Sequence, residues 1–275
     1  MKIHRPICEV IITALEQIFV EKFYADKVVN ILLKGNKKFG SRDRRFVAET
    51  VYDIVRWWRF LTFTVDRDDN YWLVLGAYLV WKKIDLPPWP EFKGVPRLPE
   101  ISKLPRAVRE SVPDWLDEVG AEELGARWDS ILPALNRPAE VILRVNTLKG
   151  DIANTKKKLA LEEVAVDDLG SGALRLKNRT NLFLTKSYQS GLFEIQDWSS
   201  QQVGPFLDVQ PGMRVVDACA GAGGKSLHLA ALMKNKGKIL ALDVSQKKLD
   251  ELKQRARRAG VDIIETRLIE GTKSI

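Results

Sequence analysis

The first third of the chain carries apolar residues at helical spacing. This pattern predicts helical structure over residues 7–33, 43–63 and 71–84, the last ending before Pro87 because proline cannot continue a helix. Large aromatic residues share this spacing. We expect them to pack in the core of a helical domain rather than to stack on bases (Trp57, Trp58, Phe60, Trp72 and Trp81).

The pattern changes after these helices. Residues 86–113 are rich in proline and predict an extended connector between units. Short helices are expected at 115–119 and 122–132. A small α/β module follows, for which the pattern predicts one helix and three strands (helix 152–161; strands 141–145, 173–176 and 182–184).

The last third of the chain alternates short apolar strands with helices. The first predicted strand runs into a Gly-rich loop, and a charged helix capped by Ser245 ends at Gly260 (strands 213–219, 238–244 and 264–269; loop 220–224; helices 225–233 and 245–259). Strands and helices in this order predict half of a doubly wound parallel sheet.

Composition sets the class of the protein. The chain has 275 residues, 45% of them hydrophobic, enough for two or three domains with their own cores. No apolar run reaches the roughly 20 residues that span a bilayer, and residues 1–6 lack the features of a signal peptide. Cys8 and Cys219 are too far apart for a zinc motif. We therefore expect a cytoplasmic protein without a membrane or metal partner.

Basic residues outnumber acidic ones by 44 to 36, for a formal net charge of +8. The excess is concentrated in a turn that precedes a predicted helix, where Ser41 is a candidate N-cap and Asp43 is the only acid. Such clustering favours a polyanionic partner, and a solvated basic face is the alternative. The candidate contacts are Lys34, Lys37, Lys38, Arg42, Arg44 and Arg45, with a second set at Lys156–Lys158, Arg175, Lys177 and Arg179.

The Gly-rich loop is the main candidate for chemistry. Glycines between a strand and a helix let a ligand approach the backbone, next to the free N–H groups of the helix start. The phosphate-binding loop motif requires glycine where Cys219 stands. The dinucleotide motif fits Gly221 and Gly223 but has Ser226 in its third glycine position. Neither motif is satisfied by this loop alone.

Asp243 narrows the class of ligand. It lies at the carboxyl end of the second predicted strand, which faces the ligand crevice in an open α/β sheet. An acid there can accept hydrogen bonds from both ribose hydroxyls of S-adenosylmethionine or NAD, and a phosphate-binding loop does not need it. A cap in the turn to Ser245 is the structural alternative. Asp217, near the end of the first strand, is equally a supporting residue or a direct ligand.

These motifs together resemble a known family. The loop and the elements after it are similar to the RNA 5-methylcytosine methyltransferases of the RsmB/Sun and nucleolar-protein type (Asp217–Ser226, DACAGAGGKS; Ala241–Ser245, ALDVS; Arg255–Gly260, RARRAG). Residues 191–201 look like the segment that leads into their catalytic domain. Residues 43–56 are similar to part of their helical NusB-like domain, and 143–148 to the first strand of their RNA-binding module.

The resemblance implies a fold and a set of site residues. It implies a Rossmann-like S-adenosylmethionine-dependent methyltransferase domain, first half only, at 191–275, preceded by a helical NusB-like domain plus connector at 1–135 and a small α/β RNA-binding module at 136–190. Asp243 would hold the cofactor ribose, and Glu270 is the best-aligned position for an acid near adenine. The loop would wrap the methionine part of the cofactor (Cys219, Ala220, Gly221, Ala222, Gly223, Gly224 and Lys225).

The resemblance also defines what residues 1–275 lack. In this family a cysteine thiolate adds to carbon 6 of cytosine, and a second cysteine assists the later elimination. Both would follow Ile275. We expect Cys8 to be buried in the first helix and Cys219 to belong to the cofactor loop, so that neither is the nucleophile. The expectation is therefore an RNA (cytosine-5-)-methyltransferase by family, truncated before its catalytic cysteines and inactive as residues 1–275 alone.

Two other functions stay open. An RNA-binding or scaffold protein with a degenerate methyltransferase domain would share the cofactor loop, and a downstream Pro-Cys and Thr-Cys in the gene would exclude it. An NAD-dependent oxidoreductase is disfavoured by Ser226 and by the basic helical extension. The sequence does not distinguish rRNA from tRNA as the substrate.

Overall fold

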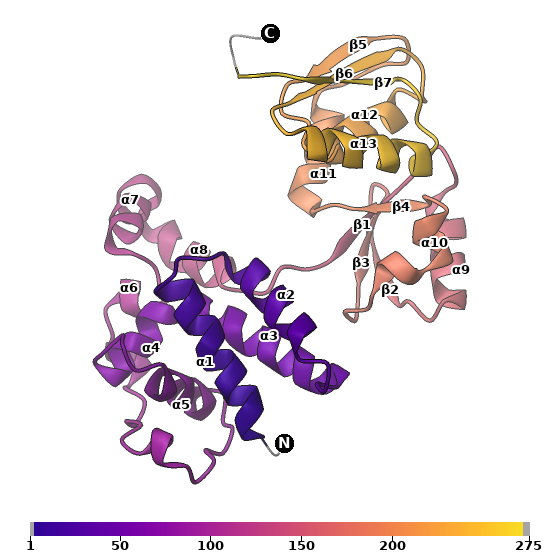
Figure 1. Cartoon of the computed structure of the whole chain (residues 1–275). Coiled ribbons are helices and arrows are strands. Elements are labelled where there is room, and N and C mark those ends of the chain that lie inside the picture. The colour runs from indigo at the N-terminus through magenta and orange to yellow at the C-terminus, as the bar shows by residue number, and fades with distance from the viewer. Residues whose placement is uncertain (1–2, 272–275) are drawn as a thin grey trace. The chain divides into compact units, whose positions relative to one another are not determined.

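The computed structural model describes residues 3–271. The chain divides into two compact units, Met1–Arg137 and Pro138–Ile275. The first is helical, and the second contains every strand of the described chain (Figure 1).

The first unit is built around a helix that is apolar on all sides. This helix, α5 (Tyr71–Trp81), buries Leu75 and Leu79 completely, and α1 (Arg5–Phe19) and α3 (Ser41–Arg56) pack against it. The predicted helical stretches all occur, the first two each as a pair of helices (with α2, Ala25–Gly35, and α4, Trp58–Val65). The aromatic residues lie in this core, as predicted (Trp57, Trp58, Phe60, Trp72 and Trp81).

The proline-rich stretch is not the predicted connector between units. Residues 86–113 form short helical turns and pack onto the first unit (η1, Pro90–Phe92; η2, Ile101–Lys103; α6, Arg106–Arg109). The Phe92 ring is buried at 5.6 Å from the Trp72 ring. A Cβ at Gly76 would lie 2.4 Å from Val95, so the bare helix backbone makes room for this segment. The unit ends with α7 (Asp114–Leu124), η3 (Gly125–Arg127) and α8 (Trp128–Leu135).

The second unit begins with a small antiparallel sheet of order β2-β3-β1-β4. Two of its strands agree with the predicted ones, β1 (Ile142–Val145) and β3 (Ala173–Leu176). The sequence pattern did not predict β2 (Val166–Gly170) or β4 (Phe193–Ile195). Its helices are α9 (Ile152–Leu161) and α10 (Lys186–Gln189). The strand predicted at 182–184 is wrong: Leu182–Leu184 is a 3₁₀ turn, η4, closed by a hydrogen bond from the Thr185 N–H to the Leu182 carbonyl. We call residues 138–196 the small module.

The remainder of the second unit is a parallel sheet of order β5-β6-β7, as predicted (β5, Arg214–Asp217; β6, Lys238–Asp243; β7, Ile264–Leu268). The crossover helices α12 (Gly224–Leu232) and α13 (Gln246–Ala259) lie on the same side of it, with α11 (Trp198–Phe206) beside α12 (Figure 1). Among the described residues no strand pairs with the outer edge of β5, and Val216 is 60% exposed. The fold is therefore half of a Rossmann-like parallel sheet, which follows a helical unit and a small α/β module along the chain.

Candidate cofactor site and nucleic-acid surface

Asp243 shapes the Gly-rich loop. The loop joins β5 to α12, and the Asp243 carboxylate accepts a hydrogen bond from the Gly221 N–H at 2.8 Å and another from the Ser245 N–H at 2.9 Å. These N–H groups, Ser245 first, lower the pKa of Asp243, which keeps it ionised at neutral pH. Asp243 thus also caps the turn to Ser245, which was the structural alternative for this residue. A carboxylate offers about four acceptor positions, so Asp243 retains capacity for ribose hydroxyls.

Two glycines give the loop its form. Gly221 has a φ of +53°, and a Cβ built there would meet no atom within 4 Å, so the backbone at this point faces open space that a ligand can fill. Gly223 has a φ of +84°, and a Cβ there would lie 2.5 Å from Leu252 on α13. One glycine therefore leaves room in front of the loop, and the other lets α13 pack behind it.

Asp217 and Ser226 support the loop from within. The Ser226 hydroxyl, completely buried, donates to the Asp217 carboxylate at 2.6 Å. This bond ties the end of β5 to the first turn of α12 and corresponds to the supporting role, one of the two alternatives for Asp217. It also explains why a polar residue occupies the third-glycine position of the dinucleotide motif.

The other predicted cofactor residues lie in the loop itself, except Glu270. Ala220 is buried, Cys219 and Lys225 are exposed, and Glu270 follows β7 at the surface. A cavity of about 110 Å³ adjoins the loop and is lined by Asp217, Lys225 and neighbouring apolar residues. Gly224 begins α12, whose first N–H groups have no partners within the helix. This donor set suits a nucleoside cofactor with a carboxylate.

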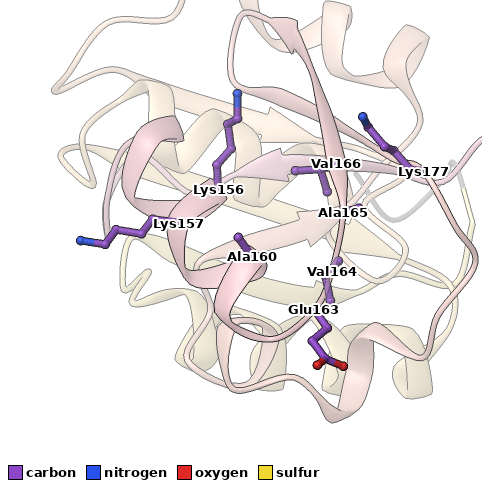
Figure 2. Close-up of a pocket in the computed structure, with 8 residues that line it drawn as sticks. All are labelled: Lys156, Lys157, Ala160, Glu163, Val164, Ala165, Val166 and Lys177. Atoms are coloured by element: carbon purple, nitrogen blue, oxygen red, sulfur yellow. The ribbon is translucent and has the colours of Figure 1, made fainter.

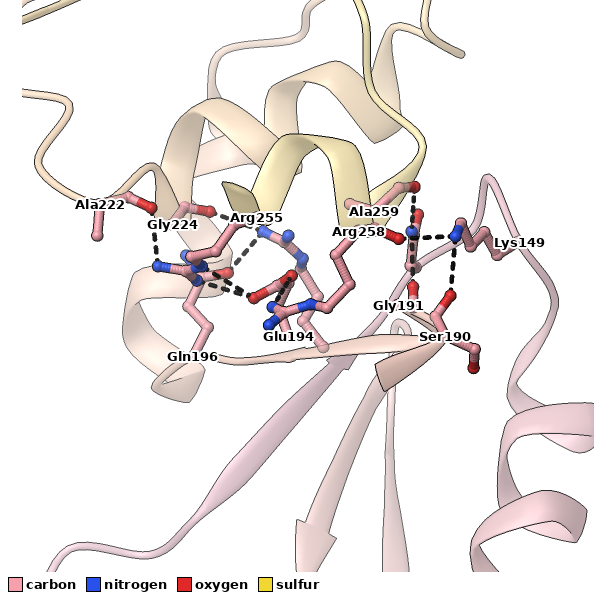
Figure 3. Close-up of polar contacts among 12 residues, drawn as sticks. Lys149, Ser190, Gly191, Glu194, Gln196, Ala222, Gly224, Arg255, Arg258 and Ala259 are labelled. Carbon is pink, nitrogen blue, oxygen red and sulfur yellow. Dashed lines mark hydrogen bonds and ion pairs between the residues drawn. The ribbon is translucent and has the colours of Figure 1, made fainter. Parts of the chain in front are cut away.

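Two arginines that sequence reasoning missed hold the loop from the opposite side. The Arg255 Nη1 donates to the Ala222 carbonyl at 2.8 Å (Figure 3). The Arg144 Nη1 donates to the Gly224 carbonyl at 2.9 Å. Arg144 comes from β1 of the small module, where burial lowers its pKa to about 10, so it remains a cation at neutral pH. These two bonds fix the Ala222 and Gly224 carbonyls of the loop.

A buried carboxylate completes this network. Glu194 on β4 is 2% exposed and accepts hydrogen bonds from Arg255 at 2.9 and 3.2 Å and from Arg258 at 2.6 Å (Figure 3). It lies directly opposite Arg144 in the sheet register. Further bonds join the small module to the end of α13, from Asn146 to the Ala259 carbonyl and from Lys149 to the Arg258 carbonyl. The sequence signal for this network was one charged residue within each of two apolar strands, Arg144 in β1 and Glu194 in β4.

One residue of the predicted basic cluster, Arg44, has a structural role instead. Its guanidinium donates to the carbonyls of Leu33, Asn36 and Phe39 at 2.6 to 3.0 Å, which closes the turn between α2 and α3. Its donors are therefore engaged by the fold rather than directed at phosphates. The other five side chains are exposed, and none forms an ion pair within residues 3–271 (Lys34, Lys37, Lys38, Arg42 and Arg45).

Three of the six residues of the second basic set are paired with acids. Arg175 pairs with Asp167 at 3.1 Å and with Glu140 at 3.2 Å. Lys177 pairs with the same Asp167, and Lys156 pairs with Asp168. Lys156 and Lys177 line a cavity of about 560 Å³ together with Lys157 and Glu163 (Figure 2). This cavity shares no residue with the Gly-rich loop, so the volume of a cavity does not identify the cofactor site here.

Comparison with known proteins confirms the class of the fold. Residues 205–274 match the sequence family described as 16S rRNA methyltransferase RsmB/F, and residues 112–182 match the ferredoxin-like domain of RsmF/B-like methyltransferases. A solved structure named PH0851 has the same fold, with a TM-score of 0.75 at 22% identity over 98% of this chain and 70% of that one.

Curated relatives identify the family. A probable ribosomal RNA small subunit methyltransferase B of Bacillus subtilis is 35% identical over 66% of this chain and 42% of its own length. A human tRNA (cytosine(72)-C(5))-methyltransferase, NSUN6, is 32% identical over 42% of this chain and 26% of its own length. The chain thus matches less than half of these relatives' length. The matches confirm the predicted family, the RNA cytosine-C5 methyltransferases of the RsmB/F type.

Residues 3–271 contain neither a membrane-spanning helix nor a cluster of metal ligands. No helix within residues 3–271 is long and apolar enough to cross a membrane. The same residues contain no group of three or more potential metal ligands.

Proposed function

We propose that this chain binds S-adenosylmethionine and RNA as part of an enzyme that methylates carbon 5 of cytosine in rRNA or tRNA. The observation that carries the proposal is the arrangement of Asp243 and the Gly-rich loop at the carboxyl ends of β5 and β6. This is the crevice in which open α/β sheets bind nucleoside ligands. The family match supports the reaction class.

Different residues bind different parts of the cofactor. Asp243 accepts the ribose hydroxyls while it holds Gly221 in place. The space in front of Gly221 and the first turn of α12 accommodate the methionine part, whose carboxylate is attracted to a helix N-terminus. Glu270, the position that best matches the acid expected from the family resemblance, would lie near adenine. The bound cofactor would supply an electrophilic methyl group.

The RNA part of the proposal rests on charge and on the relatives. Five exposed cations lie on and between α2 and α3 without acidic partners in the described chain (Lys34, Lys37, Lys38, Arg42 and Arg45). Named relatives act on ribosomal RNA and on tRNA. Because both classes occur among them, the proposal leaves the RNA class open.

Competition for the cofactor site tests the proposal. Tritiated S-adenosylmethionine is equilibrated with the chain, with S-adenosylhomocysteine or NAD as the competitor. We expect displacement by S-adenosylhomocysteine and none by NAD at the same concentration. Displacement by NAD would favour the oxidoreductase. A chain that binds RNA but no S-adenosylmethionine would favour the scaffold with a degenerate domain.

A further inference from the structure

A third cavity lies between α13 and the small module. Its volume is about 570 Å³, within the range of small-ligand sites. Phe183 and Tyr188 of the small module form one wall, and Glu251, Gln254 and Arg258 of α13 form the other. Arg255 also lines this groove, and it donates to the Ala222 carbonyl in the cofactor loop. The side chain of Arg255 therefore connects the groove to that loop.

Phe183 is an aromatic ring at the surface that contacts Tyr188. It is 58% exposed, and its ring meets Tyr188 edge-on at 5.0 Å. Tyr188 in turn contacts the fully buried Phe193 at 5.8 Å. The three rings connect the core of the small module to the groove. A ring packed against another in this way loses little conformational entropy when a ligand stacks on it.

The face of Tyr188 is already occupied. The Arg258 guanidinium lies 3.9 Å from its ring centroid, and Glu194 holds Arg258 in place at 2.6 Å. Arg255 is bound to the same carboxylate. Both arginines of the groove thus share one carboxylate, and the Arg258 guanidinium covers the ring of Tyr188. Phe183 is the aromatic ring with a free face.

The opposite wall offers hydrogen-bonding groups without partners. The side chains of Glu251 and Gln254 are exposed, and neither makes a hydrogen bond or ion pair in the part of the chain that the structure describes. A carboxylate and an amide one helical turn apart can match the donors and acceptors on the edge of a base. A free aromatic face opposite such groups is the chemistry that recognises a nucleobase.

We propose that this groove binds one unpaired nucleotide of the RNA, with the base stacked on Phe183 and its edge directed at Gln254 and Glu251. The inference rests on the proposed RNA substrate and deepens it. The base must be unpaired because a base inside a helix cannot expose its face to a side chain. The nucleotide would occupy a position beside the cofactor loop.

Anisotropy measurements on the whole chain test this site with three fluorescein-labelled probes. These are a 12-nucleotide single-stranded RNA of mixed sequence, the same strand with abasic riboses, and the matching duplex. Phe183→Ala should weaken binding of the intact strand about tenfold, the usual loss for one stacked base. It should leave the abasic strand and the duplex unchanged. Phe183→Trp should bind the intact strand at least as tightly as the wild type.

Leu184→Ala is the matched control, because Leu184 is a neighbouring apolar side chain that is also exposed. It should bind all three probes like the wild type. An equal loss on all probes for Phe183→Ala would overturn the inference by showing a structural role. No loss on any probe would overturn it as well. A wild-type chain that binds none of the probes would instead refute the proposed RNA partner, and the inference with it.

Discussion

Glu194 of β4 and Arg255 of α13 join the small module to the cofactor loop. The Arg255 Nε and Nη2 lie 3.2 and 2.9 Å from Glu194 Oε2, while its Nη1 reaches the Ala222 carbonyl at 2.8 Å. A carboxylate on the small module therefore orients the arginine that fixes the Gly-rich loop. The two parts of the second unit share one network of charges.

Neutralising this carboxylate should destabilise the second unit. Glu194→Gln keeps the shape of the side chain but leaves Arg255 and Arg258 without their counter-charge. Loss of one partner from a buried ion pair costs about 3–5 kcal/mol, and we expect about 3 kcal/mol because the arginines are partly exposed. Urea unfolding measures the change. Glu251→Gln, an exposed acid on α13, is the control and should have no effect. Equal stability of the two variants would mean that the pairs contribute nothing.

His228 should make stability depend on pH. Burial, with the charge of Arg144 as a second cause, lowers the pKa of His228 to about 4 from a model-peptide value near 6.5. The unfolded state then binds more protons than the folded state below pH 6.5, so the stability present above that pH is lost as pH falls towards 4. Between pH 7.5 and 5 this amounts to about 1–2 kcal/mol, allowing for partial solvent exposure.

The comparison that isolates this effect is His228→Asn against His4→Asn. The chain has two histidines, and His4 is exposed. Unfolding free energies at pH 7.5 and 5 should show a smaller pH dependence for His228→Asn and an unchanged one for His4→Asn. A wild-type dependence retained in His228→Asn would show that other groups cause it.

Arg42 and Arg45 should act on RNA binding, and Arg44 on stability. Removal of one phosphate contact lowers the slope of log K against log salt by about 0.7 to 0.9. The double variant Arg42→Ala/Arg45→Ala should therefore flatten the slope by up to about 1.5, measured by RNA titration between 50 and 200 mM salt. Arg44→Ala should leave the slope nearly unchanged and lower the melting temperature, because three carbonyls lose their donor. An unchanged slope in the double variant, together with a flattened slope in Arg44→Ala, would contradict these roles.

Local patterns predicted the elements around the cofactor loop. The apolar runs of β5 and β6, the glycines and the terminal Asp243 are each specified within a few residues of sequence. Other features depend on residues far apart in the chain. The pairing of Glu194 with Arg255 arises only in the folded unit, and the carbonyls that engage Arg44 exist only once the turn has formed. The packing of residues 86–113 likewise requires the bare surface at Gly76.

Residues 1–275 by themselves should transfer no methyl group to RNA. The route to 5-methylcytosine requires a thiolate nucleophile. Cys8 is completely buried, and burial raises its pKa to about 12, so it is neither accessible nor ionised. Cys219 belongs to the loop that we assign to the cofactor. A tritium-transfer assay on ribosomal RNA and tRNA transcripts checks this. Turnover by residues 1–275 would require another nucleophile.

The central claim is that Asp243 and the Gly-rich loop bind S-adenosylmethionine, and calorimetric titration of Asp243→Ala tests it most directly. Loss of a charged acceptor for two hydroxyls should cost about 1.5–3 kcal/mol, roughly 10- to 100-fold in affinity. Asp262→Asn, an exposed acid beyond α13, is the control and should bind the cofactor like the wild type. Unchanged affinity in Asp243→Ala, with wild-type binding in the control, would contradict the assignment of this crevice to the cofactor.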